Sequence, residues 1–145
     1  MITTDSAERT LPLLEPESAF FWTSGADGIL RIQRCNACGH WQHPPLPLCP
    51  CCHGDDVAPR RVSGLGRVKT FTINHQPWLP GMAVPFAFAA VELEEQPELY
   101  VLSNVLGPVD AVRSGMAVKA CFQRHDDVWL PLFRPLESGP LEGTP

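Results

Sequence analysis

CNACGH begins at Cys35, and CPCCHG begins at Cys49. Each stretch holds a C-x-x-C pair, Cys35 with Cys38 and Cys49 with Cys52. In such a short turn the first Cys reverses the chain, so that both sulfurs and several backbone N–H groups face one ion. Two pairs at this spacing predict a tetrahedral four-thiolate zinc site. Because protein ligands would fill all four positions on the metal, the zinc is expected to be structural rather than catalytic.

The other cysteines and the neighbouring histidines fit this site less well. Cys51 lies inside the second pair, where a C-x-C arrangement with Cys49 would hold the metal poorly, so it is interpreted as a spectator. Replacement of one sulfur ligand by His40 or His53 stays open. Cys121 lies among apolar residues and is expected to be a small core residue rather than a nucleophile.

Length and composition favour a small intracellular protein. A chain of 145 residues fits one compact domain, or one small domain with a metal-stabilised appendage. No apolar run approaches the roughly 20 residues of a membrane span, and the acidic N-terminus lacks the features of a signal peptide. C-x-x-C pairs without an export signal predict a reducing cytoplasm.

Charge is distributed unevenly along the chain, whose net charge is −5. Residues 31–69 carry six basic against two acidic side chains, whereas residues 70–145 carry four basic against nine acidic ones. A basic segment on an acidic protein suits a phosphate-bearing small ligand or an acidic partner surface. An ordinary solvated face is the alternative interpretation.

The N-terminal part is expected to hold one short helix. Pro16 and the following Glu suit the start of a helix that runs to Trp22, and Gly25 is expected to end it. Phe20, Phe21 and Trp22 are adjacent aromatics that one helix cannot bury against a single face. The helix therefore either docks on a partner or packs over the metal-binding segment.

The remainder is expected to be mainly β. Residues 29–34 alternate as a strand that leads to the metal site, and residues 41–48 are extended by their prolines, which together make a rubredoxin-like zinc ribbon. Five further strands predict an OB-fold barrel. They are expected at Arg67–His75, Phe86–Leu93, Leu99–Val105, Val118–Arg124 and Val128–Phe133. The predicted organisation is a flexible tail (1–14), helix and ribbon (15–62), barrel (63–136) and a second flexible tail (137–145).

A Pro-rich apolar loop follows the first barrel strand at residues 76–85. Its Trp78 is costly to expose unless it covers a core or lines a binding surface, and both interpretations stay open. His75 precedes the loop and could meet a substrate or the active site of a partner, although a surface or hydrogen-bonded histidine is the simpler interpretation.

Several motifs in this order resemble one known family. They are GILRIQRCNACG from Gly28, PPLPLCPCC from Pro44, SGLGRVKTFT from Ser63 and LPLF from Leu130. The chain resembles the zinc-ribbon/OB-fold, acyl-CoA-associated family that was long catalogued as a domain of unknown function, DUF35. The resemblance implies an accessory subunit of an acyl-CoA-processing complex, with one structural zinc at the four matching cysteines.

The resemblance also implies partners. Family members pair with thiolase-like acyltransferases, or with retro-aldolases of steroid side-chain catabolism, or are fused to MaoC-type enoyl-CoA hydratases, and the partner carries the catalytic residues. A two-plus-two hetero-oligomer is expected. On this hypothesis the aromatic helix docks on the partner or caps its tunnel, and the Trp78 loop and His75 lie nearest the acyl chain. The partner or channel residues are Phe20, Phe21, Trp22, His75 and Trp78, and the CoA phosphates would meet Arg60, Arg61, Arg67 and Lys69.

Two alternatives belong to other functional classes. The chain could be a stand-alone CoA-thioester binding module, or a single-stranded nucleic-acid-binding OB-fold protein. The acidic balance of residues 70–145 argues against nucleic acid, which needs a basic groove. The sequence lacks G-x-S-x-G, H-E-x-x-H and a dinucleotide fingerprint, so catalysis by this chain alone is not expected.

Overall fold

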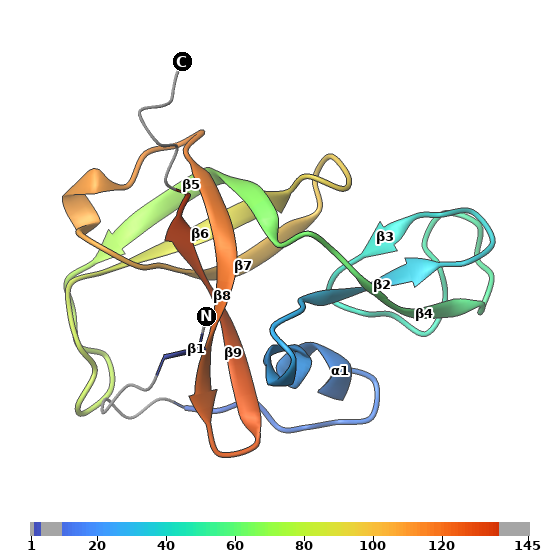
Figure 1. The fold of residues 1–145 in the computed structure, drawn as a ribbon, viewed down its shortest axis with the longest axis horizontal. Helices are drawn as coiled ribbons and strands as arrows, with labels where there is room; N and C mark the ends of the chain where they lie inside the picture. The colour runs from blue at the N-terminus through green and yellow to red at the C-terminus, as the bar shows by residue number, and fades with distance from the viewer. Residues whose placement is uncertain (1, 4–9, 137–145) are drawn as a thin grey trace.

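The computed structural model describes residues 2–3 and 10–136. It is mainly β, with a small three-stranded sheet beside a larger sheet that closes into a barrel (Figure 1). A short helix, α1, lies in the angle between the two sheets and contacts both. The predicted fold class, a helix and zinc ribbon followed by a five-stranded OB-fold barrel, is confirmed.

The ribbon sheet has the strand order β3-β2-β4, all antiparallel, with β2 at Arg31–Cys35, β3 at Trp41–Gln42 and β4 at Val57–Arg61. The proline-rich segment after β3 is not a strand but is held by a side chain. Gln33, which is buried, donates to the backbone oxygen of Leu46 at 2.8 Å and accepts from its N–H at 3.0 Å. This exchange fixes the loop that leads to the second cysteine pair.

The barrel strands follow in the order β8-β5-β6-β7-β9, and β9 pairs with β8 to close the barrel. Only β7 and β9 run parallel within it. The strands are β5 (Leu65–Asn74), β6 (Phe86–Leu93), β7 (Tyr100–Val105), β8 (Ala117–His125) and β9 (Val128–Pro135). Each lies at its predicted place in the sequence. A short 3₁₀ turn, η2, lies at Val109–Ala111 between β7 and β8.

One further strand joins the sheet near the N-terminus. β1, Ile2–Thr3, pairs in parallel with Phe122 and Gln123 of β8. β5 pairs with β8 only up to Lys119, which lies opposite Leu65, the first residue of β5. β1 therefore pairs with the part of β8 that β5 does not reach. Half of the predicted tail over residues 1–14, namely residues 1 and 4–9, and all of the tail over 137–145 lie outside the described residues.

The helical region differs from the prediction. α1 covers only Ala19–Trp22, and a 3₁₀ turn, η1, follows at Ser24–Ala26. Gly25 therefore does not end the helix but lies within η1. A Cβ at Gly25 would lie 2.6 Å from Phe122 Cγ and from Trp129 Cβ, so close packing on the β8–β9 hairpin requires glycine here.

Hydrogen bonds join the ribbon to the barrel through the β6–β7 connection. Gln96 accepts from the N–H of Trp41 and donates to its carbonyl oxygen, each at 2.9 Å. Glu95 accepts from the N–H of Ser63 at 2.8 Å. Trp41 belongs to the same buried cluster as the barrel residues. No helix in the described part of the chain is long and apolar enough to cross a membrane.

Candidate metal centre and docking surface

The four predicted cysteines meet at one end of the ribbon. All four Sγ atoms lie within 4.8 Å of one another, and the Sγ atoms are 3.6 Å apart for Cys35 and Cys52 and 3.5 Å apart for Cys38 and Cys49. Zinc–sulfur bonds of about 2.3 Å give a tetrahedron with edges of about 3.8 Å. The sulfurs therefore already surround a volume that fits one zinc ion, as predicted.

The two knuckles repeat the same backbone hydrogen bond. The N–H of Gly39 donates to the carbonyl of Cys35, and the N–H of His53 donates to that of Cys49, each at 2.9 Å. The donor residue has a left-handed backbone in both knuckles, with φ of 83° at Gly39 and 64° at His53. Glycine adopts this conformation freely, whereas histidine adopts it at a cost.

Backbone N–H groups favour the thiolate form of one sulfur in each knuckle. The N–H of Cys52, followed by that of Cys51, lowers the pKa of Cys49 to about 6. The N–H of Cys38 likewise lowers the pKa of Cys35. The thiolate is the form that binds metal. One structural zinc would be held by these four sulfurs, and its coordination would be complete.

The remaining candidate ligands do not join this cluster. Within residues 2–3 and 10–136, the His, Cys, Asp and Glu side chains close enough to share an ion at this end of the ribbon are the four cysteines alone. Cys51 is exposed and lies outside the group, as do His40 and His53. Cys121 is buried, and burial raises the pKa of its thiol, which fits the predicted core position.

The aromatic helix faces mostly inward. Phe21 is only 4% exposed, and its ring centroid lies 4.8 Å from that of Trp22 and 4.5 Å from that of His43. Burial lowers the pKa of His43 to about 4. Phe20 and Trp22 are partly buried against the core. Phe21 is therefore unavailable for the predicted docking, because the helix packs on the ribbon and the barrel, whereas Trp22 keeps an accessible face.

That face opens into a groove of about 650 Å³, which we call the apolar groove. Its walls come from Trp22, residues 10–12, the loop after β5, and parts of β6, β7 and β9. None of its lining residues carries a charged side chain. A second hollow of about 430 Å³ shares the lining residues Trp22, Leu102 and Pro131 with it, so the two lie side by side.

Large apolar side chains stand exposed around the apolar groove. Exposure is 72% for Trp78, 62% for Leu102, 46% for Leu79 and 42% for Phe88. Leu79, Phe88 and Leu102 line the groove, and Trp78 precedes Leu79 in the sequence. His75 is exposed at the end of β5 but is not part of the groove lining.

Phe88 and Leu102 were not identified as candidate site residues from the sequence. The sequence signal for Phe88 is the unbroken apolar run at the start of β6. A strand with one face in solvent alternates apolar and polar residues, so an unbroken run indicates that the outer face is apolar too. Ala87 and Ala89 point into the barrel core, so Phe88 between them must point outward. Leu102 lies opposite Ala90 on the same outer face.

The basic residues predicted to meet CoA phosphates are distributed over two sheets. Arg60 and Arg61 lie on β4, whereas Arg67 and Lys69 lie on β5. Arg60 donates to the side chain of Asn36 at 2.6 Å. The four residues therefore do not form one continuous row.

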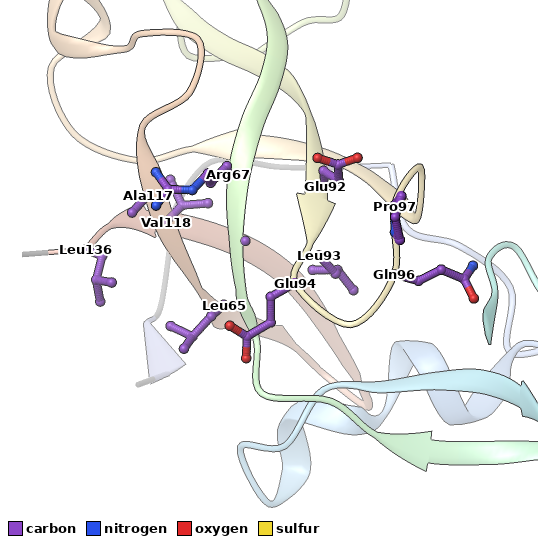
Figure 2. Close-up of a pocket in the computed structure, with 11 residues that line it drawn as sticks. Leu65, Arg67, Glu92, Leu93, Glu94, Gln96, Pro97, Ala117, Val118 and Leu136 are labelled. Carbon is purple, nitrogen blue, oxygen red and sulfur yellow. The ribbon is translucent and has the colours of Figure 1, made fainter. Parts of the chain in front are cut away.

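Two smaller pockets hold one of these arginines each. Figure 2 shows a pocket of about 360 Å³ where Arg67 shares the lining with Glu92 and Glu94, a balance that disfavours a phosphate. Arg61 lines a different pocket of about 400 Å³, together with Lys119. The second pocket is the better candidate for an anion.

Fold and site together define a zinc-ribbon/OB-fold protein with a closed four-cysteine centre. The chain belongs to the ChsH2 family: residues 22–58 match its rubredoxin-like zinc ribbon domain and residues 59–123 its C-terminal OB-fold domain.

Relatives of the chain are named as subunits of acyl-CoA enzymes. It is 37% identical over 130 residues to the 3-oxo-4,17-pregnadiene-20-carboxyl-CoA hydratase alpha subunit of Mycobacterium tuberculosis, covering 87% of this chain and 40% of that protein. It is 29% identical over 96 residues to the benzoylsuccinyl-CoA thiolase subunit BbsA of Thauera aromatica, covering 61% of this chain and 66% of that one. The chain thus spans less than half of the hydratase subunit's length.

A solved structure shows the same fold. The chain superimposes on a chain from the Ltp2-ChsH2(DUF35) aldolase with a TM-score of 0.77 and 32% identity. The match covers 86% of this chain and 98% of that one. It therefore includes both the ribbon and the barrel.

Proposed function

We propose that this protein is a non-catalytic accessory subunit that binds a thiolase-like enzyme and helps to form its acyl-CoA site. The observation that carries the proposal is the match to nearly the whole length of a chain from the Ltp2-ChsH2(DUF35) aldolase. The similarity to a subunit named for a CoA thiolase supports the same class of partner.

The chemistry of the metal centre and of the apolar groove favours a structural role over catalysis. Four thiolates would complete the coordination of zinc and leave no position for substrate. The largest hollow described has an uncharged lining, so it offers no general acid or base. The reaction would then be carried out by groups of the partner enzyme.

The CoA part of the substrate needs cationic contacts, and the pocket with Arg61 and Lys119 is where we propose them. The proposed partner is an acyl-CoA acyltransferase or a retro-aldolase of steroid side-chain breakdown, in a two-plus-two complex. A MaoC-like hydratase is the second candidate, favoured by the relative that is named as a hydratase subunit. We also propose a cytoplasmic location, because the free cysteines bind zinc only while reduced.

A stand-alone CoA-thioester module is the alternative function. The observation that favours it is the same basic pocket, which lies wholly within this chain. A nucleic-acid-binding role gains no support, because the large groove carries no cation to meet a phosphate backbone.

Reconstitution tests the proposal. The candidate thiolase-like enzyme is assayed for acyl-CoA turnover alone, with this protein, and with its Cys35→Ser variant. We expect full activity only with the wild-type chain, and little with the variant because its ribbon loses zinc. Equal activity of the enzyme alone would refute the accessory role. Tight binding of acyl-CoA to this chain alone, with no effect on any enzyme, would favour the stand-alone module.

A further inference from the structure

We infer that the apolar groove, extended by Trp78, is the face that docks on the thiolase-like partner, through an uncharged apolar surface of that enzyme. This inference rests on the proposed function and adds the location and chemistry of the interface. It rests on the positions of the exposed apolar side chains, on the hydrogen bond that holds Trp78, and on the absence of charged side chains from the groove lining.

Exposed apolar side chains concentrate at this face. Nine large apolar residues are exposed in the described part of the chain, and three of them, Leu79, Phe88 and Leu102, line the groove. Trp78 adjoins Leu79, and Leu13 and Leu14 follow the lining residue Pro12 in sequence. A contiguous apolar patch of this kind on a soluble protein marks an interaction site.

Trp78 is held in place although it is exposed. Its indole Nε1–H donates to Asn74 Oδ1 at 3.0 Å, and Asn74 Nδ2 donates to the carbonyl oxygen of Gln76 at 2.8 Å. The bonded indole nitrogen does not need water, and its ring presents a fixed apolar surface. An aromatic anchor that is ordered before binding loses little entropy on docking.

The shape of the face favours a protein over a small ligand as occupant. A ligand inside the groove would leave Trp78 exposed, because Trp78 is not one of the lining residues. A partner surface can cover the groove and Trp78 together. The absence of charge from the lining matches the centre of a protein interface, where charged residues are depleted. The partner surface should accordingly be apolar and uncharged.

Charge substitution on the folded protein tests the inference. The variant Leu102→Asp and the matched control Leu136→Asp add the same charge at exposed leucines, but Leu136 lines the separate pocket of Figure 2. Affinity for the thiolase-like enzyme is measured by calorimetry. Zinc content and thermal unfolding of each variant show that it is folded.

We expect Leu102→Asp to weaken binding by about 100-fold or more, because it leaves an unpaired charge in the interface. Trp78→Ala should weaken it about 30-fold, as for an ordered aromatic side chain that is buried on binding. The control Leu136→Asp should change it less than threefold. Asn74→Ala should weaken binding by about threefold to tenfold, and should have no further effect in the Trp78→Ala background.

The outcomes separate the interface from the function. If the wild-type protein binds the enzyme and Leu102→Asp and Trp78→Ala leave that affinity unchanged, the inference is overturned while the accessory role stands. Intact partner binding with weakened acyl-CoA uptake by the complex would make the groove a ligand site, which also overturns it. Failure of the wild-type chain to bind at all would refute the proposed function itself.

Discussion

The contact between η1 and the β8–β9 hairpin predicts a large cost for adding one methyl group at Gly25. In the Gly25→Ala variant the new carbon would start 2.6 Å from Phe122 Cγ and 2.6 Å from Trp129 Cβ. Carbon atoms pack at about 3.5–4.0 Å, so the turn must move away by about 1 Å. Phe122 is buried in the core and cannot move aside.

Forcing a methyl into such a packed site costs about 1–3 kcal/mol of unfolding free energy, and two aromatic neighbours place Gly25→Ala in the upper half of that range. For a chain of this size, a loss of about 2 kcal/mol lowers Tm by roughly 4–8 °C. Urea and thermal unfolding with zinc present measure both quantities.

The matched control is Ala26→Ser, which adds one heavy atom to the same turn at an exposed position. It should change the unfolding free energy by less than about 0.5 kcal/mol. A Gly25→Ala variant as stable as this control would refute the close packing of η1 on the hairpin, and with it the anchoring of Trp22 at the groove.

Three further perturbations test the ribbon and its surroundings. Cys52→Ser should abolish zinc binding, whereas Cys51→Ser should retain zinc, as measured by metal analysis of the purified proteins. Loss of zinc from both variants would contradict the ligand assignment. Gly39→Ala should lower zinc affinity by about 5- to 30-fold in a chelator competition, because a left-handed backbone costs an alanine about 1–2 kcal/mol. An unchanged affinity would argue against the knuckle geometry. Burial lowers the pKa of His43 to about 4, below the ordinary value near 6.5. As the pH falls, the unfolded chain therefore binds a proton at His43 before the folded chain does. The free energy of unfolding should drop by about 2 kcal/mol between pH 7 and pH 5 for this reason. His43→Leu should remove that share of the acid sensitivity in urea unfolding at the two pH values, and parallel losses in the two proteins would show that His43 does not contribute.

The metal site and the barrel strands could be predicted because their signals are local. Two C-x-x-C pairs define their own knuckles, and the five strands are separated by turn residues. The short parallel pairing of Ile2–Thr3 could not be predicted, since only the fold brings β8 beside it. The helix ends at Trp22 as predicted but begins at Ala19 rather than Pro16, because residues 16–18 form a turn. The conformation at Gly25 could not be predicted either, since packing on Phe122 and Trp129 determines it.

The docking surface was predicted only in part. Trp22 and Trp78 were named from the sequence, but the groove also needs Leu102 and Leu130, which come from strands distant in the chain. Phe21 was expected among the contacts, yet it is buried by tertiary packing that no local pattern reveals. A surface assembled from several segments has no sequence signature of its own.

Native mass spectrometry of this protein co-expressed with a thiolase-like enzyme from the same organism tests the accessory role most directly. The account predicts a hetero-oligomer with equal numbers of the two chains and one zinc for each copy of this chain. A zinc-bearing chain that never associates with the enzyme, at concentrations where related subunits would assemble, would contradict it.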